Sequence, residues 1–146
     1  MGKRWMRRCL ASLLCMAALG LSACGGRGPV GADAFTIRMI CQSEDIYQIF
    51  YTCYIGGESR GIGGMADLEG GELTEESDLT LTFSKSYFEE GDDPADFSLD
   101  FSPYGKEDTA EIGTTAPLAI PADWGETYTV VFSGDRQSGF HAALAE

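Results

Sequence analysis

The chain has 146 residues, with 23 acidic and 10 basic side chains, so its formal net charge is −13. This charge argues against nucleic-acid binding, because phosphate contacts need clustered lysine and arginine. Aromatic residues make up 11% of the chain, a content that excludes a disordered polypeptide and indicates one folded domain. An acidic surface leaves basic partners and divalent cations as the charged ligands to consider.

The first 23 residues have the pattern of an export signal. Four basic residues stand at the start, and every residue from 9 to 23 is apolar or small. This apolar run is too short to span a membrane comfortably, since a spanning helix needs about 20 apolar residues. A basic start, a short apolar middle and a small-residue end predict a cleaved signal helix. Its removal would leave the mature chain more acidic than the whole chain.

The end of this segment resembles the lipobox of bacterial lipoproteins. Leu21, Ser22 and Ala23 match the leucine–small–small pattern, and Cys24 follows. The resemblance implies a diacylglyceryl group on Cys24, cleavage before it, and attachment to the extracytoplasmic face of the cell membrane. Two acyl chains anchor a protein stably, whereas one chain does so only marginally. Two other interpretations are an ordinary secretory signal ending at Ala23 and an uncleaved helix.

The sequence divides into a signal peptide (1–23), the lipidated cysteine with a glycine-rich tether (24–33), and a folded domain (34–146). Within the domain, apolar residues alternate with polar ones in several short runs bounded by Gly, Pro, Asp and Ser. This pattern is typical of β-strands. It predicts strands over residues 34–41, 46–55, 78–87, 96–101, 127–132 and 139–145, with a hairpin turn at 133–138. Apart from the signal, no long helical stripe occurs, so we expect an antiparallel β-sandwich.

The stretch WGETYTVVFSGD (124–135) resembles a late strand of immunoglobulin-like domains, in which a glycine precedes a tyrosine-bearing strand. The cysteine that follows the tyrosine in antibody domains has no counterpart after Tyr128. The resemblance therefore implies a generic immunoglobulin-like sandwich.

Cys41 and Cys53 are the two cysteines of the predicted domain, and both fall on apolar faces of predicted strands. In an exported domain a cysteine pair favours a disulfide. Two buried thiols fit the pattern equally, because sequence spacing does not establish the distance between the two Cα atoms.

Gly57-Glu58-Ser59-Arg60-Gly61 matches the letters of the G-x-S-x-G nucleophile motif. A hydrolase would need Ser59 on a strand-to-helix turn, with His141 as its base. The following residues, GIGGMADLEGG, do not form a helix pattern. We therefore interpret this region as a glycine-rich connection between strands, where glycines permit a bulge or a positive φ.

An acidic loop offers a candidate calcium site, because calcium takes six to eight oxygen ligands. Its spacing is not that of an EF-hand, and a solvated acidic loop is the simpler interpretation. The candidate ligands are Glu89, Glu90, Asp92, Asp93 and Asp96. Otherwise we expect no cofactor.

Aromatic residues near strand ends are candidates for stacking on a ligand: Tyr54, Tyr87, Tyr104 and Trp124. Together these features predict a lipid-anchored binding module of the cell envelope, without enzymatic activity, whose partner is an envelope protein or a glycan. A small envelope hydrolase, using Ser59 and His141 or a pair of acids, and a purely structural lipoprotein are the alternatives.

Overall fold

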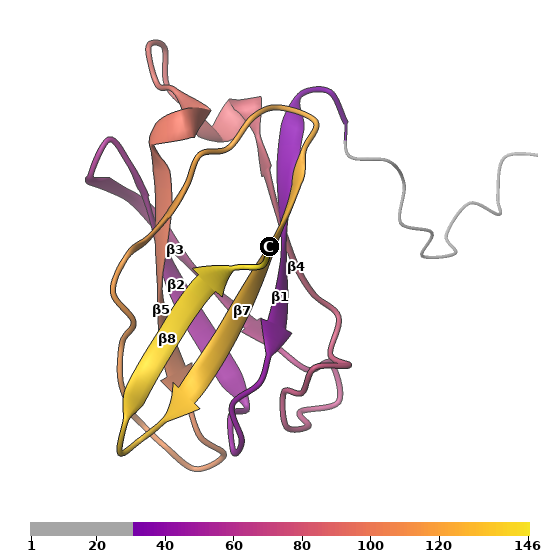
Figure 1. Cartoon of the computed structure of the whole chain (residues 1–146), viewed down its shortest axis with the longest axis vertical. Helices are drawn as coiled ribbons and strands as arrows, with labels where there is room; N and C mark the ends of the chain where they lie inside the picture. Colours follow the sequence, from indigo (N-terminus) through magenta and orange to yellow (C-terminus); the bar gives the residue numbers. More distant parts are fainter. Residues whose placement is uncertain (1–30) are drawn as a thin grey trace, which may run out of the picture.

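The computed structural model describes residues 31–146, which form an all-β sandwich consistent with an immunoglobulin-like fold (Figure 1). Cys24 and the predicted signal lie outside the described residues. Two short 3-10 helices, η1 (Lys85–Tyr87) and η2 (Pro94–Asp96), precede the fifth strand. The strands are β1 (Ala34–Cys41), β2 (Gln48–Ile55), β3 (Glu58–Ala66), β4 (Leu79–Ser84), β5 (Phe97–Tyr104), β6 (Leu118–Ile120), β7 (Thr127–Asp135) and β8 (Gly139–Leu144).

The strands form two four-stranded sheets, in the orders β4-β1-β7-β8 and β3-β2-β5-β6. All pairs are antiparallel except β1 with β7, which is parallel and departs from the antiparallel prediction. The chain crosses from β6 and enters the first sheet beside the start of β1. There Gly125 N donates to Ala34 O and Thr36 N donates to Glu126 O. Both strands therefore begin at the same end of the sandwich.

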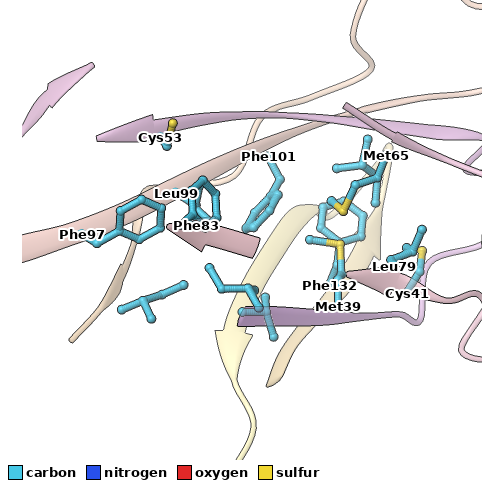
Figure 2. Close-up of a cluster of buried hydrophobic side chains, with 14 of the residues drawn as sticks. Met39, Cys41, Cys53, Met65, Leu79, Phe83, Phe97, Leu99, Phe101 and Phe132 are labelled. Atoms are coloured by element: carbon cyan, nitrogen blue, oxygen red, sulfur yellow. The ribbon is translucent and has the colours of Figure 1, made fainter. Parts of the chain in front are cut away.

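The core lies between the two sheets and follows from the alternation along each strand. In β1, Phe35, Ile37, Met39 and Cys41 are buried, while the residues between them face outward or lie part-exposed. Side chains from both sheets meet in this layer (Figure 2). Because side chains on successive residues point to opposite faces, a period-two pattern buries one face of each sheet.

The six predicted strands are confirmed, with their ends shifted by a few residues, and the predicted hairpin joins β7 to β8. Two strands, β3 and β6, were not predicted. In β3 the alternation is missing, because glycines occupy positions whose side-chain space is filled from elsewhere. A Cβ atom on Gly61 would meet the Tyr87 hydroxyl, and one on Gly63 would meet the Tyr51 ring.

The glycine-rich region is thus a strand and its hairpin turn. Gly56 and Gly57 both have positive φ (59° and 83°), as a two-residue hairpin turn requires. The β2–β3 register also shifts between Cys53 and Tyr54, so the expected bulge and positive φ are both found.

The sandwich has two distinct ends. The tether end contains the start of β1, where Lys85 N donates to Asp33 O and Gly125 N donates to Ala34 O. The opposite end, here called the loop end, contains the connections at 42–47, 105–117 and 136–138, beyond the final residues of β1, β5 and β7 (Figure 1).

Candidate functional site

Two adjoining clefts open at the loop end. The larger encloses about 500 Å³ and is lined by Gln42, Glu44, Asp45, Ile112, Gly134, Asp135, Arg136, Gln137 and Phe140. The smaller encloses about 350 Å³ and is lined by Asp45, Tyr47, Gly105, Lys106, Glu107, Asp108 and Arg136. Asp45 and Arg136 line both clefts, so the two form one continuous depression built by three loops.

Arg136 stands between the two clefts and is held by an ion pair with Asp108. The same Asp108 oxygen accepts a hydrogen bond from Gly105 N at 3.0 Å. A Cβ atom at position 105 would lie 2.8 Å from an Arg136 nitrogen, so the close approach of the guanidinium requires glycine there. The 105–117 loop and the β7–β8 hairpin are thus joined through their charged side chains.

Asp135 organises the hairpin itself. Its Oδ1 accepts hydrogen bonds from the backbone N atoms of Ser138 and Gln137, both at 2.7 Å. These bonds lower the pKa of the Asp135 carboxyl, because they stabilise its charged form, and the bond from Ser138 contributes most.

The 42–47 loop forms the third wall of the clefts, beside the 105–117 loop and the β7–β8 hairpin. Asp45 has a φ of 58°, in the left-handed region, and its backbone N donates to Glu72 Oε1 at 2.6 Å. Beside it, the Lys106 ammonium lies 5.9 Å from the centre of the Tyr47 ring. This arrangement is a cation–π contact.

The charge of the clefts is predominantly negative. Five carboxylates and two basic groups line them, and one of those basic groups, Arg136, is already paired with Asp108. Ile112 and Phe140 add an apolar wall. Such a surface suits a positively charged group attached to a partly apolar body, since the carboxylates attract the charge and the wall shields the body from water.

The predicted stacking residues separate into two groups. Tyr54 and Tyr104 lie on the outer face of the β3-β2-β5-β6 sheet. The Tyr54 hydroxyl donates to Asp100 Oδ2 at 2.7 Å, and the Tyr104 ring lies 5.2 Å from the exposed Phe50 ring. The hydrogen bond to Asp100 raises the pKa of Tyr54. Ligand stacking by these two residues stays a prediction.

Tyr87 and Trp124 instead pack at the margin of an aromatic cluster at the tether end, where Tyr87 is 36% exposed. Their rings lie 6.1 Å and 5.0 Å from the Phe88 ring, respectively, and Trp124 also packs against Phe35. Trp124 is only part-exposed, and the Tyr87 hydroxyl contacts the Cys53 thiol. Burial of the hydroxyl raises the pKa of Tyr87 most, and the contact with Cys53 raises it further. Both residues therefore pack against the domain while keeping part of their surface exposed, and ligand stacking by either one stays a prediction.

The carboxylates of the acidic loop (89–96) are largely used within the protein. Arg60 of β3 forms ion pairs with Glu89 at 3.0 Å and Asp92 at 2.9 Å. Asp93 Oδ1 accepts from Ala95 N and caps η2, while Glu90 and Asp96 are exposed. Within residues 31–146, no group of three or more His, Cys, Asp or Glu side chains is placed to hold a metal ion. Calcium binding here stays a prediction.

Cys41 and Cys53 are free and buried, the second of the two arrangements considered from the sequence. They lie on strands of different sheets and are well separated in the core (Figure 2). Cys41 lies at the loop end of β1, whereas β2 carries Cys53 toward the tether end. The Cys41 thiol donates to Ser43 O, and its burial raises its pKa, which keeps the thiol protonated.

Ser59 and His141 do not meet, so the hydrolase alternative that uses Ser59 as nucleophile and His141 as its base is wrong. Ser59 is paired with Tyr54 on the β3-β2-β5-β6 sheet, and His141 is paired with Ser133 on the other sheet. Both are exposed, on opposite faces of the sandwich: Ser59 is paired with the outward-facing Tyr54, and His141 follows the buried Phe140. Ser59 also lies in a strand, without the following helix that the nucleophile motif needs.

No known protein family, curated protein or solved structure matches this chain. In the part of the chain that the structure describes, no helix is long and apolar enough to cross a membrane.

Sequence reasoning missed the clefts at the loop end. Asp135 and Arg136 fell within the predicted hairpin turn, but Asp45 and Asp108 come from separate loops whose convergence leaves no local pattern.

Proposed function

We propose that this protein is a lipid-anchored binding module on the extracytoplasmic face of a bacterial cell membrane, and that its loop end is the binding end. The lipobox-like residues before Cys24 support the anchor. The observation that carries the binding end is the continuous cleft there, separated from the first residue of β1 by the full length of that strand. Eight strand residues span roughly 25 Å.

The distance between the start of β1 and the clefts determines which way the clefts would face relative to the membrane. A chain tethered through Cys24 would join the sandwich at Ala34, so the loop end would face away from the bilayer. A glycine-rich tether of about ten residues has an end-to-end distance of roughly 17–19 Å and leaves the domain free to reorient. The clefts would then be accessible to molecules of the envelope.

The charge of the clefts narrows the class of ligand. Five lining carboxylates against two basic groups favour an envelope protein or glycan that presents amino groups, and disfavour anionic polymers. We propose that binding is the whole activity, with no cofactor and no reaction.

Site-specific photocrosslinking in cells tests this proposal. A photoreactive amino acid replaces exposed Gln137 at the tip of the β7–β8 hairpin in the full-length protein. The matched control replaces exposed Arg38 on the outer face of β1. The proposal predicts an adduct from position 137 and none from position 38. Equal adducts from both positions, or none from 137, would contradict a binding role for the loop end.

A further inference from the structure

The β3 strand leaves one edge of its sheet open. It is the outermost strand of the order β3-β2-β5-β6 and has nine residues. The opposite edge of this sheet, β6, has only three residues and stands between Pro117 and Pro121. Prolines and short lengths protect sheet edges against pairing with another chain, so β6 is protected and β3 differs from it.

Six of the nine residues of β3 lack the charges and prolines that block pairing at sheet edges. Residues 61–66, GIGGMA, contain no charge and no proline. The uncharged stretch is bounded by Arg60, whose side chain forms ion pairs with Glu89 and Asp92. Arg60 lies next to the shift in the β2–β3 register. The edge strands of the other sheet, LTLTFS in β4 and GFHAAL in β8, also contain no acidic residue, lysine, arginine or proline. What distinguishes β3 from them is a large apolar side chain exposed on its outer face.

The outer face of this stretch carries a projecting side chain, Ile62, near the Phe50 ring, which covers Gly64. Ile62 is 80% exposed and Phe50 on the neighbouring strand is 43% exposed. Phe50 is paired with Gly64, and its ring lies 3.3 Å from the position that a Cβ atom on Gly64 would occupy. Two residues along one strand thus offer a projecting aliphatic side chain and a glycine that is covered by an aromatic ring.

We infer that β3 pairs antiparallel with β3 of a second copy of this chain, with Ile62 of each copy opposite Gly64 of the other. Residues opposite one another in an antiparallel pair point to the same face, so outward Ile62 must meet another outward residue. Opposite Gly64, which has no side chain of its own, Ile62 contacts the Phe50 ring that covers this glycine in the second copy. The same contact occurs twice, as a two-fold interface requires.

The self-complementarity of the edge identifies the occupant as a second copy. The projecting Ile62 and the ring-covered Gly64 lie two positions apart on the same strand, so an antiparallel second copy brings each of them opposite the other. The pairing buries two of the large apolar side chains that the monomer exposes and joins two four-stranded sheets into one. The negative charges lie outside the paired stretch, and salt screens their repulsion, with a Debye length of about 8 Å at physiological ionic strength.

Sedimentation of residues 31–146, which contain every described strand and the core, tests the dimer. We expect a monomer-to-dimer transition between about 1 and 200 µM that shifts to lower concentration as salt is added. Ile62→Lys should remain monomeric with an unchanged Tm. Ala143→Lys, a lysine on the edge strand of the other sheet, should dimerise like wild type. A wild-type chain that stays monomeric at 200 µM in high salt, or an Ile62→Lys variant that dimerises normally, would overturn the inference.

Cysteine crosslinking tests the register. An equimolar mixture of Ile62→Cys and Gly64→Cys chains should form disulfide-linked heterodimers faster than either variant alone forms homodimers, because directly opposite residues have the Cα separation that a disulfide needs. Faster homodimer formation by Ile62→Cys alone would place the two Ile62 positions opposite each other and overturn the register.

Discussion

Arg60 of β3 and Asp92 of the acidic loop form an ion pair with an N–O distance of 2.9 Å, and both side chains are largely shielded from water, at 20% and 13% exposure. Asp92 also accepts a hydrogen bond from Glu89 N through its other oxygen. The acidic loop therefore folds around the guanidinium of Arg60, which already compensates the negative charges of Glu89 and Asp92.

Replacing Arg60 should destabilise the protein. Arg60→Ala leaves Glu89 and Asp92 without their counterion, and we expect Tm to fall by roughly 2–6 °C. Arg38→Ala, which removes an exposed arginine from the outer face of β1, should change Tm by less than about 1 °C. Thermal unfolding of the three proteins measures the difference, and equal Tm values would show that the ion pairs contribute nothing.

The same measurement in millimolar calcium addresses the metal hypothesis. Because Arg60 already compensates the loop, the Tm of the wild type should not change. A clear rise in Tm with calcium, lost on replacement of Glu90 and Asp96, would show that the loop binds the ion after all.

The two core cysteines should behave as free thiols. Under denaturing conditions without reductant, purified residues 31–146 should take up two equivalents of an alkylating agent, on Cys41 and Cys53. Mass spectrometry counts the labels. A chain that reacts only after reduction, or whose Tm falls in reductant, would contain the disulfide that the structure lacks.

Phe35 is the centre of the aromatic cluster at the tether end. Its ring contacts those of Phe83, Phe88, Phe97, Trp124 and Tyr128, and its side chain is fully buried. Phe35→Ala should lower the free energy of unfolding by about 3–5 kcal/mol, because it leaves a cavity. Phe50→Ala, on the outer face, should cost clearly less. Denaturant unfolding at low protein concentration compares them, and similar losses would contradict this packing.

Asp135 should make the loop end sensitive to acid. Its pKa in the folded protein is lowered by the hydrogen bonds from Ser138 and Gln137, so its charged form stabilises the fold. This stabilisation is fully present above the pKa of the unfolded chain, about 3.9, and is lost as the pH falls through the lower folded value. The stability difference between wild type and Asp135→Asn should therefore shrink as the pH falls below about 4. A difference that is independent of pH would refute the assignment.

The anchor can be tested by fractionation of cells. Cys24→Ser removes the acceptor of the lipid, so the protein should leave the membrane fraction or accumulate as an unprocessed precursor. Cys15→Ser, within the predicted signal, provides the matched control and should remain in the membrane fraction. Unchanged fractionation of the Cys24→Ser protein would contradict the lipobox interpretation.

Much of the fold was predictable because local alternation determines which face of a strand is buried. Phe35, Ile37, Met39 and Cys41 show the pattern plainly, and they form the core face of β1. β3 escaped prediction because its inward positions 61 and 63 are glycines covered by Tyr87 and Tyr51, which come from elsewhere in the chain. Strand formation there depends on tertiary contacts that no local window contains.

The candidate site was predictable only in part, for a related reason. Tyr54 and Tyr104 were identified as aromatic residues near strand ends, and the structure places both on one sheet face, but neither lines the clefts. The clefts, by contrast, arise where three separate loops converge. No sequence spacing predicts that Asp45, Asp108 and Arg136 come together there. The acidic loop was visible in the sequence, but its partner Arg60 was not, because 29 residues or more separate them.

Binding at the loop end is the central claim, and it can be measured directly with immobilised residues 31–146 exposed to envelope extract and to cell-wall glycan, with and without calcium. Arg136→Glu, which breaks the pair with Asp108 and adds negative charge between the clefts, serves as the test variant, with Arg38→Glu as its charge-matched control. We expect saturable retention of one partner by the wild type and Arg38→Glu, and its loss in Arg136→Glu. Retention that survives Arg136→Glu, or no retention under either condition, would contradict it.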